Sequence, residues 1–133
     1  MSSLRRITNQ SEYDVSYIKL ENRGNNGNVP KNSVGEMDVW FPWVNTPGEF
    51  ASKVIVVEMI GLARIYLWES DQYLWYCISK ENLEGPFNRN TNVTIMGNEF
   101  SSGLIVPGDA TRNNKELEIR NRGTTISIKM YNC

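Results

Sequence analysis

The residues of this chain best suited to recognition chemistry are aromatic side chains between positions 63 and 79. Aromatic and aliphatic side chains alternate on both sides of a Ser-Asp pair in this segment. This pattern predicts a β-hairpin with Ser70-Asp71 as its turn. One face of that hairpin carries a set that we call the aromatic row: Arg64, Tyr66, Trp68, Tyr73 and Trp75.

The predicted turn pairs Trp68 with Tyr73 and Tyr66 with Trp75 across the two strands. The other face receives a mostly aliphatic set suited to a core: Ala63, Ile65, Leu67, Leu74, Tyr76 and Ile78. Because Arg64 is costly to bury without a partner, we expect the aromatic row to be the accessible face. Its rings would stack on the apolar faces of sugars while Arg64 and Asp71 hold hydroxyl groups, or they would receive a choline head group.

A second aromatic cluster is Trp40-Phe41-Pro42-Trp43. Strand alternation puts Trp40 on the polar side with Asp38, and Phe41 on the opposite side. Pro42 ends any central strand, so Trp43 begins a loop or lies at a sheet edge. Trp40 is a candidate ligand-binding residue, and for both tryptophans the alternative is a structural role in capping an open end of the fold.

Catalytic chemistry finds little support. The chain has no histidine, which removes the commonest general base and the commonest metal ligand. Its glutamates show no pattern that places two carboxyls opposite each other as a glycosidase needs. Cys77 and Cys133 lack metal-ligand spacing, and their pairing in a disulfide stays open. We therefore expect no enzyme, no metal and no cofactor.

The elements that must position these residues are strands. Stretches rich in β-branched and aromatic residues alternate with clusters of Asn, Gly, Pro and Asp, and this pattern is typical of an all-β chain. It predicts a single antiparallel β-sandwich or jelly roll of about eight to nine strands, spanning residues 1–133 as one domain. The expected strands cover residues 4–9, 13–21, 35–41, 53–59, 62–69, 72–79, 92–96, 116–121 and 124–131. Long Asn-rich loops are expected at 22–33, 81–92 and 97–114.

Composition and charge restrict the partners. The chain has 133 residues and a formal net charge of −1, and this balance argues against nucleic acid. No run approaches the roughly 18 apolar residues of a transmembrane span. The N-terminus has no apolar signal core, so we expect cytoplasmic synthesis without a recognisable signal peptide, with later release left open.

Three classes of function remain. The first is lectin-like carbohydrate binding through exposed aromatic residues and Asn-rich loops. The second is binding of membrane lipid head groups, as in a small pore-forming cytolysin whose Trp-bearing loops enter the membrane interface. The third is a protein-binding inhibitor or an assembly subunit, including a homo-oligomer, with Tyr and Trp as interface anchors.

In overall character, an Asn-rich β chain of this size with aromatic clusters is similar to small defence lectins and toxins, the cytolysins of fungi and bacteria. The resemblance is one of class, and it implies a non-catalytic binding protein without assigning a role to any residue.

Overall fold

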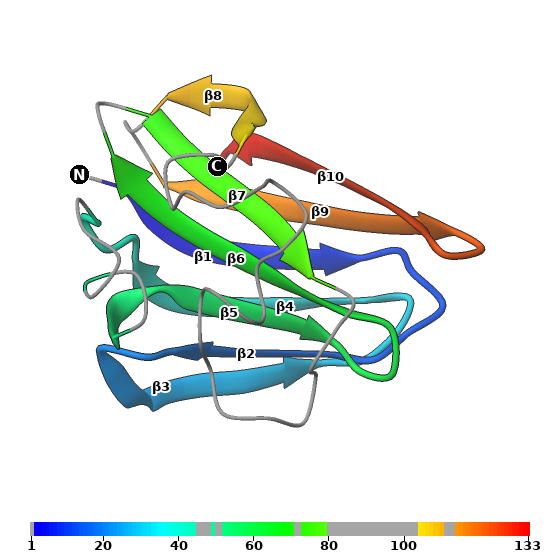
Figure 1. The fold of residues 1–133 in the computed structure, drawn as a ribbon. Helices are drawn as coiled ribbons and strands as arrows, with labels where there is room; N and C mark the ends of the chain where they lie inside the picture. The colour runs from blue at the N-terminus through cyan, green and yellow to red at the C-terminus, as the bar shows by residue number, and fades with distance from the viewer. Residues whose placement is uncertain (1, 45–48, 50–51, 71–72, 80–103, 111–113) are drawn as a thin grey trace.

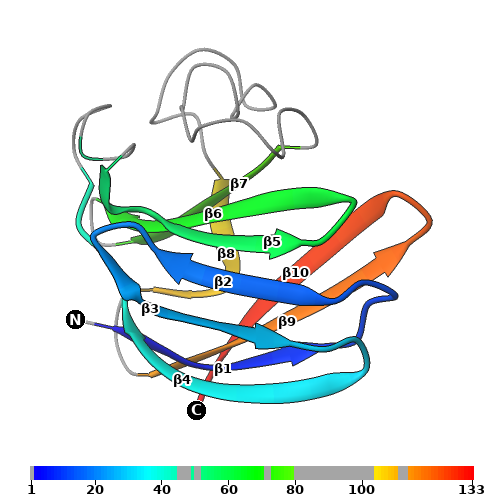
Figure 2. The same cartoon turned by 90° about the horizontal axis from the view of Figure 1, so that it is seen from below.

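A computed structural model describes residues 2–44, 49, 52–70, 73–79, 104–110 and 114–133. In this part of the chain, ten strands form two sheets that face each other as the layers of a β-sandwich (Figures 1 and 2). The all-β class expected from the sequence is confirmed.

The first layer is a four-stranded sheet in the order β10-β9-β1-β4. Its strands are β1 (Ser3–Asn9), β4 (Ser33–Trp40), β9 (Lys115–Arg122) and β10 (Thr125–Asn132). Strand β1 pairs antiparallel with β4 and parallel with β9. The N-terminal strand thus lies inside this sheet, between a neighbour close in sequence and one from the C-terminal end.

The second layer is a six-stranded sheet in the order β3-β2-β5-β6-β7-β8. Its strands are β2 (Val15–Lys19), β3 (Asn22–Val29), β5 (Ile55–Met59), β6 (Ala63–Ser70), β7 (Tyr73–Ser79) and β8 (Leu104–Ala110). All of its neighbouring strands pair antiparallel.

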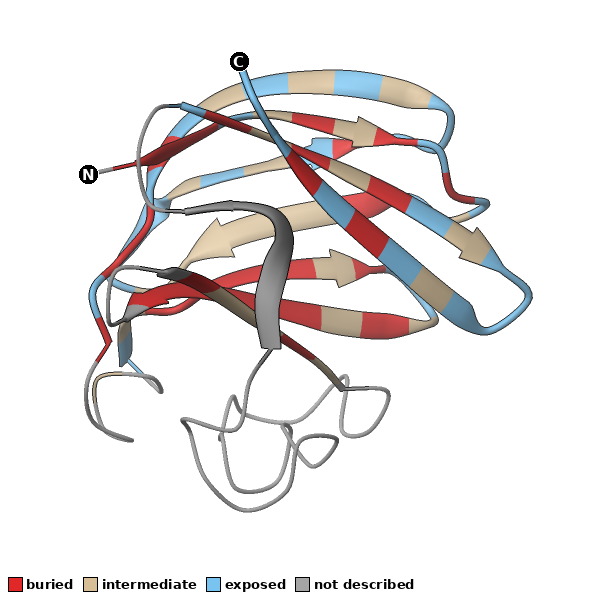
Figure 3. Cartoon of the chain, turned by 90° about the horizontal axis from the view of Figure 1, so that it is seen from above, coloured by how far each residue is buried: buried red, intermediate tan, exposed pale blue. Residues whose placement is uncertain are grey.

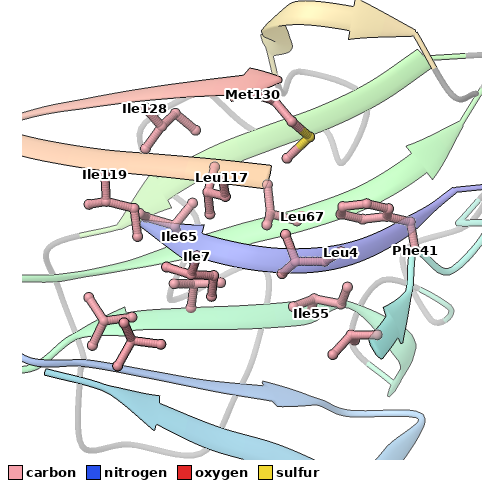
Figure 4. Packing of buried hydrophobic residues seen from close by; sticks show 14 of the residues in the cluster. Leu4, Ile7, Phe41, Ile55, Ile65, Leu67, Leu117, Ile119, Ile128 and Met130 are labelled. Atoms are coloured by element: carbon pink, nitrogen blue, oxygen red, sulfur yellow. The ribbon is translucent and has the colours of Figure 1, made fainter. Parts of the chain in front are cut away.

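The main core fills the space between the two sheets. Leu4, Ile7, Leu117 and Met130 contribute from the four-stranded sheet, and residues such as Ile65 contribute from the six-stranded one (Figure 4). These side chains are buried because they occupy alternate positions on strands whose intervening residues point outward. The alternation is clearest along β9 and β10, where buried residues and less buried or exposed ones follow one another (Figure 3).

Asn9 ties the end of β1 to the neighbouring chain segments. Its side chain is fully buried, and its Nδ2 donates to the carbonyls of Tyr13 at 2.8 Å and Val29 at 3.0 Å. Its Oδ1 accepts from the backbone N–H of Ser11 at 3.0 Å and from the Ser11 hydroxyl at 2.6 Å. All four hydrogen-bonding positions of the amide are therefore used, which is what a buried polar group requires.

Two strands lie where the sequence predicts loops. Residues 22–33 include β3, and residues 97–114 include β8. The loop prediction is wrong for β3 because its Asn and Gly residues resemble turn chemistry, although pairing with β2 holds them in a ladder. The strand expected at 92–96 and the loop expected at 81–92 lie outside the described residues.

Candidate functional site

The hairpin of the aromatic row forms, but two residues away from its expected register. Ser70 pairs with Tyr73, and Trp68 pairs with Trp75. The expected pairs of Trp68 with Tyr73 and of Tyr66 with Trp75 are therefore wrong, because Ser70 is itself paired with Tyr73 in the ladder and is not a turn residue. A two-residue shift preserves strand alternation, so Tyr66, Trp68, Trp75 and Cys77 still belong to one side of the sheet.

That side is not open to a ligand at Tyr66 and Trp68. Both side chains are buried, in a second hydrophobic cluster that also contains Val44, Val54, Val56 and Cys77. Trp75 packs against the same cluster and is half-buried. The expectation that the aromatic row is the accessible face is wrong at these positions, because the six-stranded sheet buries large apolar side chains on both of its faces.

Arg64 is engaged within the protein. Its Nε lies 3.5 Å from a carboxylate oxygen of Glu58 on the adjacent strand, and only 11% of its side chain is exposed. Burial raises the pKa of Tyr66 to about 12, and a hydrogen bond with Arg64 acts in the opposite direction. Arg64 thus acts as a structural partner on this face. Asp71 and the side chain of Tyr73, the remaining candidates of the hairpin, lie outside the described residues.

Among the candidates whose side chains the structure describes, Trp40 is the one that is classed as exposed. It ends β4 with 50% of its surface exposed, whereas Val39 and Phe41 on either side are buried. The predicted alternation through this segment is confirmed. Trp43 is also exposed, at 42%.

Trp40 and Trp43 line one hollow of about 370 Å³, which we call the tryptophan groove. This volume falls within the range of small-molecule sites. The full lining set is Lys19, Glu21, Trp40, Phe41, Pro42, Trp43 and Lys53. These residues come together because β2 and β4 end, and β5 begins, at the same end of the sandwich (Figure 1).

Backbone hydrogen bonds fix the segment that carries the two indoles. The N–H of Phe41 donates to the carbonyl of Ser2 at 3.1 Å, and the N–H of Glu69 donates to that of Pro42 at 2.8 Å. The N–H of Val44 in turn donates to the carbonyl of Glu69 at 2.9 Å. With Phe41 and Val44 buried on either side, the segment is held by both sheets and presents Trp43 as an anchored side chain.

An alternating chain of charges forms the polar wall of the groove. Lys19 Nζ lies 3.3 Å from Glu21 Oε1, and Lys53 Nζ lies 3.9 Å from Glu21 Oε2. Lys53 Nζ also lies 3.2 Å from Glu49 Oε2, one helical turn earlier in the sequence. The groove therefore combines two exposed aromatic surfaces with ammonium donors and carboxylate acceptors.

A second, smaller hollow of about 260 Å³ lies on the outer side of the four-stranded sheet, between Arg5, Arg6, Glu36, Met37, Asn114 and Cys133. Arg5 lies 3.4 Å from Asp38, and Arg6 lies 3.7 Å from Glu36 and 3.2 Å from Glu116. Exposed ion pairs of this kind are typical of a solvated sheet face. Without an exposed aromatic ring, this hollow is the weaker candidate for a binding site.

Within the residues that the structure describes, no cluster of three or more Cys, Asp or Glu side chains could hold a metal ion. The same residues include no helix long and apolar enough to cross a bilayer. Cys77 is buried and Cys133 exposed, and neither forms a disulfide.

Comparisons of the chain with protein-family models, with curated proteins and with solved structures gave no match. The candidate site therefore stands on its own geometry.

Trp40 is both a residue predicted from the sequence and part of the groove lining, whereas the sequence places the other predicted residues on the hairpin and does not indicate Lys19, Glu21 and Lys53. The Trp-Phe-Pro-Trp motif was a usable signal for Trp43. No local signal links the lysines to it, because Lys19 and Lys53 reach the groove only through the pairing of β2 with β5.

Proposed function

We propose that this protein is a non-catalytic, lectin-like module that binds carbohydrate in the tryptophan groove. The observation that carries the proposal is the exposure of Trp40 and Trp43 in one hollow beside charged donors and acceptors. Indole faces offer flat apolar area to the C–H faces of a sugar ring. The ammonium groups donate and the carboxylate of Glu21 accepts hydrogen bonds, and a sugar hydroxyl can serve both.

The acids in and beside the groove favour carbohydrate over a lipid membrane. A surface that enters the membrane interface would bring Glu21 and Glu49 toward the apolar phase, and burying carboxylates there is costly. Phe87 and Phe100, the aromatic residues that would complete a membrane-facing tip, lie outside the described residues. Head-group binding, a cytolysin activity and a protein partner therefore stand as alternatives that the experiment must separate.

The test is a glycan array followed by titration of purified protein, with intrinsic tryptophan fluorescence as a second readout. Trp40→Ala and Trp43→Ala should each weaken glycan binding at least tenfold, because each removes an exposed stacking surface. Ile60→Ala is the matched control: Ile60 is also exposed but lies outside the groove lining, so binding should not change.

Liposome co-sedimentation of the same variants separates the alternatives. Carbohydrate binding predicts that wild type stays in the supernatant with vesicles that lack glycolipid. Sedimentation that depends on Trp40 and Trp43, without binding to any glycan, would instead establish the lipid-binding alternative.

A further inference from the structure

The charges in and beside the tryptophan groove cancel one another: the lining holds two lysines and one glutamate, and a second glutamate contacts one of these lysines from beside the groove. Lys19 and Lys53 provide two positive charges, and Glu21 and Glu49 provide two negative ones, in a chain of contacts that alternates in sign. Only 12% of the Lys19 side chain is exposed. The ammonium group of Lys19, the last residue of β2, is thus already paired with Glu21 within the protein.

An acidic ligand would have to compete with these internal partners. A carboxylate or sulfate group that approaches Lys19 or Lys53 also approaches Glu21, which contacts both lysines. Like charges brought together at a binding surface oppose association. Drawing one lysine toward the ligand would cost Glu21 one of its two ion-pair partners.

A cationic ligand meets the converse obstacle. The indole faces of Trp40 and Trp43 would attract a cation, but two ammonium groups lie on the same wall. A neutral hydroxyl avoids both penalties, because it accepts from an ammonium group and donates to a carboxylate without disturbing the ion pairs.

Resting on the proposed carbohydrate-binding function, we infer that the groove is specific for uncharged sugars and discriminates against acidic glycans. Glu21 is the specificity-determining residue, because it contacts both lysines and keeps them from acting as an anion site. The two indoles supply stacking area, and the charge-balanced wall selects the class of sugar.

The experiment compares two arms of one glycan array. The neutral arm holds oligosaccharides of glucose, galactose, mannose, fucose and N-acetylglucosamine, and the acidic arm holds sialylated, sulfated and uronate-containing glycans. Wild type should bind members of the neutral arm, with affinity that changes less than about twofold between about 50 and 500 mM NaCl, since no net charge is screened.

Glu21→Gln is the informative variant. It keeps the side-chain shape but releases Lys19 and removes one of the two carboxylates that contact Lys53. The variant should therefore gain binding to the acidic arm, and this new binding should weaken with salt. Glu36→Gln makes the same charge change at a side chain that is 78% exposed and outside the groove, and it should gain none.

The outcomes separate this inference from the function on which it rests. Wild type that prefers acidic glycans in a Trp40-dependent manner would overturn the specificity and leave carbohydrate binding intact. Wild type that binds neither arm would overturn both. A Glu21→Gln variant that rejects acidic glycans as wild type does would remove Glu21 from its assigned role.

Discussion

The indole rings of this chain occupy two kinds of environment that residue type alone does not distinguish. Trp68 is 1% exposed and packs with Tyr66 and Val56, whereas Trp40 and Trp43 are half-exposed at one end of the sandwich. A large apolar ring stabilises the fold where it is enclosed and offers contact area where it is open. Mutations of the two kinds should therefore separate stability from binding.

Trp68→Ala should lower the free energy of unfolding by about 3–5 kcal/mol, as large-to-small changes of buried aromatic residues do. Trp40→Ala should change it by less than about 1 kcal/mol, because its ring is already half in solvent. Urea denaturation followed by circular dichroism measures both. A Trp68→Ala protein as stable as wild type would show that the second hydrophobic cluster contributes little to the fold.

Glu69 is a buried acid, and we expect its ionisation to lower the free energy of unfolding. Its side chain is 1% exposed, and neither carboxylate oxygen has a hydrogen-bond partner among the described residues. Burial raises the pKa of Glu69. Because the folded state holds this proton more tightly than the unfolded state, stability is fully present below the ordinary glutamate pKa and falls as pH rises through the raised value.

Glu69→Gln should therefore increase the free energy of unfolding at pH 7 relative to wild type. The gain should shrink as pH falls through the raised pKa toward the ordinary glutamate value of 4.5, and it should change no further below that value. Chemical denaturation at a series of pH values measures the difference. Glu36→Gln, at an exposed position, serves as the control and should show no such pH-dependent gain. A Glu69→Gln protein less stable than wild type across the whole pH range would contradict the assignment.

At the scale of elements, strand alternation in the sequence predicts which side chains face the core. Phe41 and Trp40 fall on the expected sides, and the β9–β10 pair forms where Leu117, Ile119 and Ile128 alternate with polar residues. Alternation alone predicts neither the register between two strands nor which residues pack over a sheet face. Nothing local to Ser70 indicates that it pairs with Tyr73 and does not belong to the turn. Likewise, nothing local to Trp68 indicates that Val44 and Val54 share its cluster.

Close packing between β3 and β4 depends on Gly35. A Cβ at this position would lie 2.6 Å from Cγ2 of Val29, a buried and rotationally stiff side chain. Gly35→Ala should therefore destabilise the protein by about 1–3 kcal/mol, as overpacking does. Gly24→Ala is the matched control on β3, because its nearest neighbour would be 3.5 Å away.

Combining Gly35→Ala with Val29→Ala tests the cause. If the clash explains the loss, the double variant should be more stable than the sum of the two single effects allows, with a coupling of at least about 0.5 kcal/mol. Strict additivity would mean that Gly35 matters for some reason other than its contact with Val29.

For the whole molecule, the parallel pairing of β1 with β9 brings strands from the two ends of the chain side by side. Arg6 and Glu116 meet across these strands although 110 positions separate them in the chain. Long-range pairings of this kind slow folding, because the chain loses the entropy of closing a large loop before the stabilising contacts form.

Refolding from urea should accordingly take milliseconds to seconds, the range typical of all-β domains rich in non-local contacts. Stopped-flow intrinsic tryptophan fluorescence, to which the buried Trp68 contributes, and far-UV circular dichroism should report the same rate if the two sheets form together. Completion in microseconds would show that the β1–β9 pairing does not limit folding.

The turn between β9 and β10 is a suitable point for attaching the protein to a surface or to a second copy. Gly123 adopts a positive φ of 62° with open space around it, and this turn projects from the end of the sandwich opposite to that at which β4 stops (Figure 1). A linker or surface attachment inserted there would leave Trp40 and Trp43 directed away from the support. Two copies joined back to back through this turn would present both grooves outward, an arrangement that converts a weak single contact into avidity on a multivalent surface.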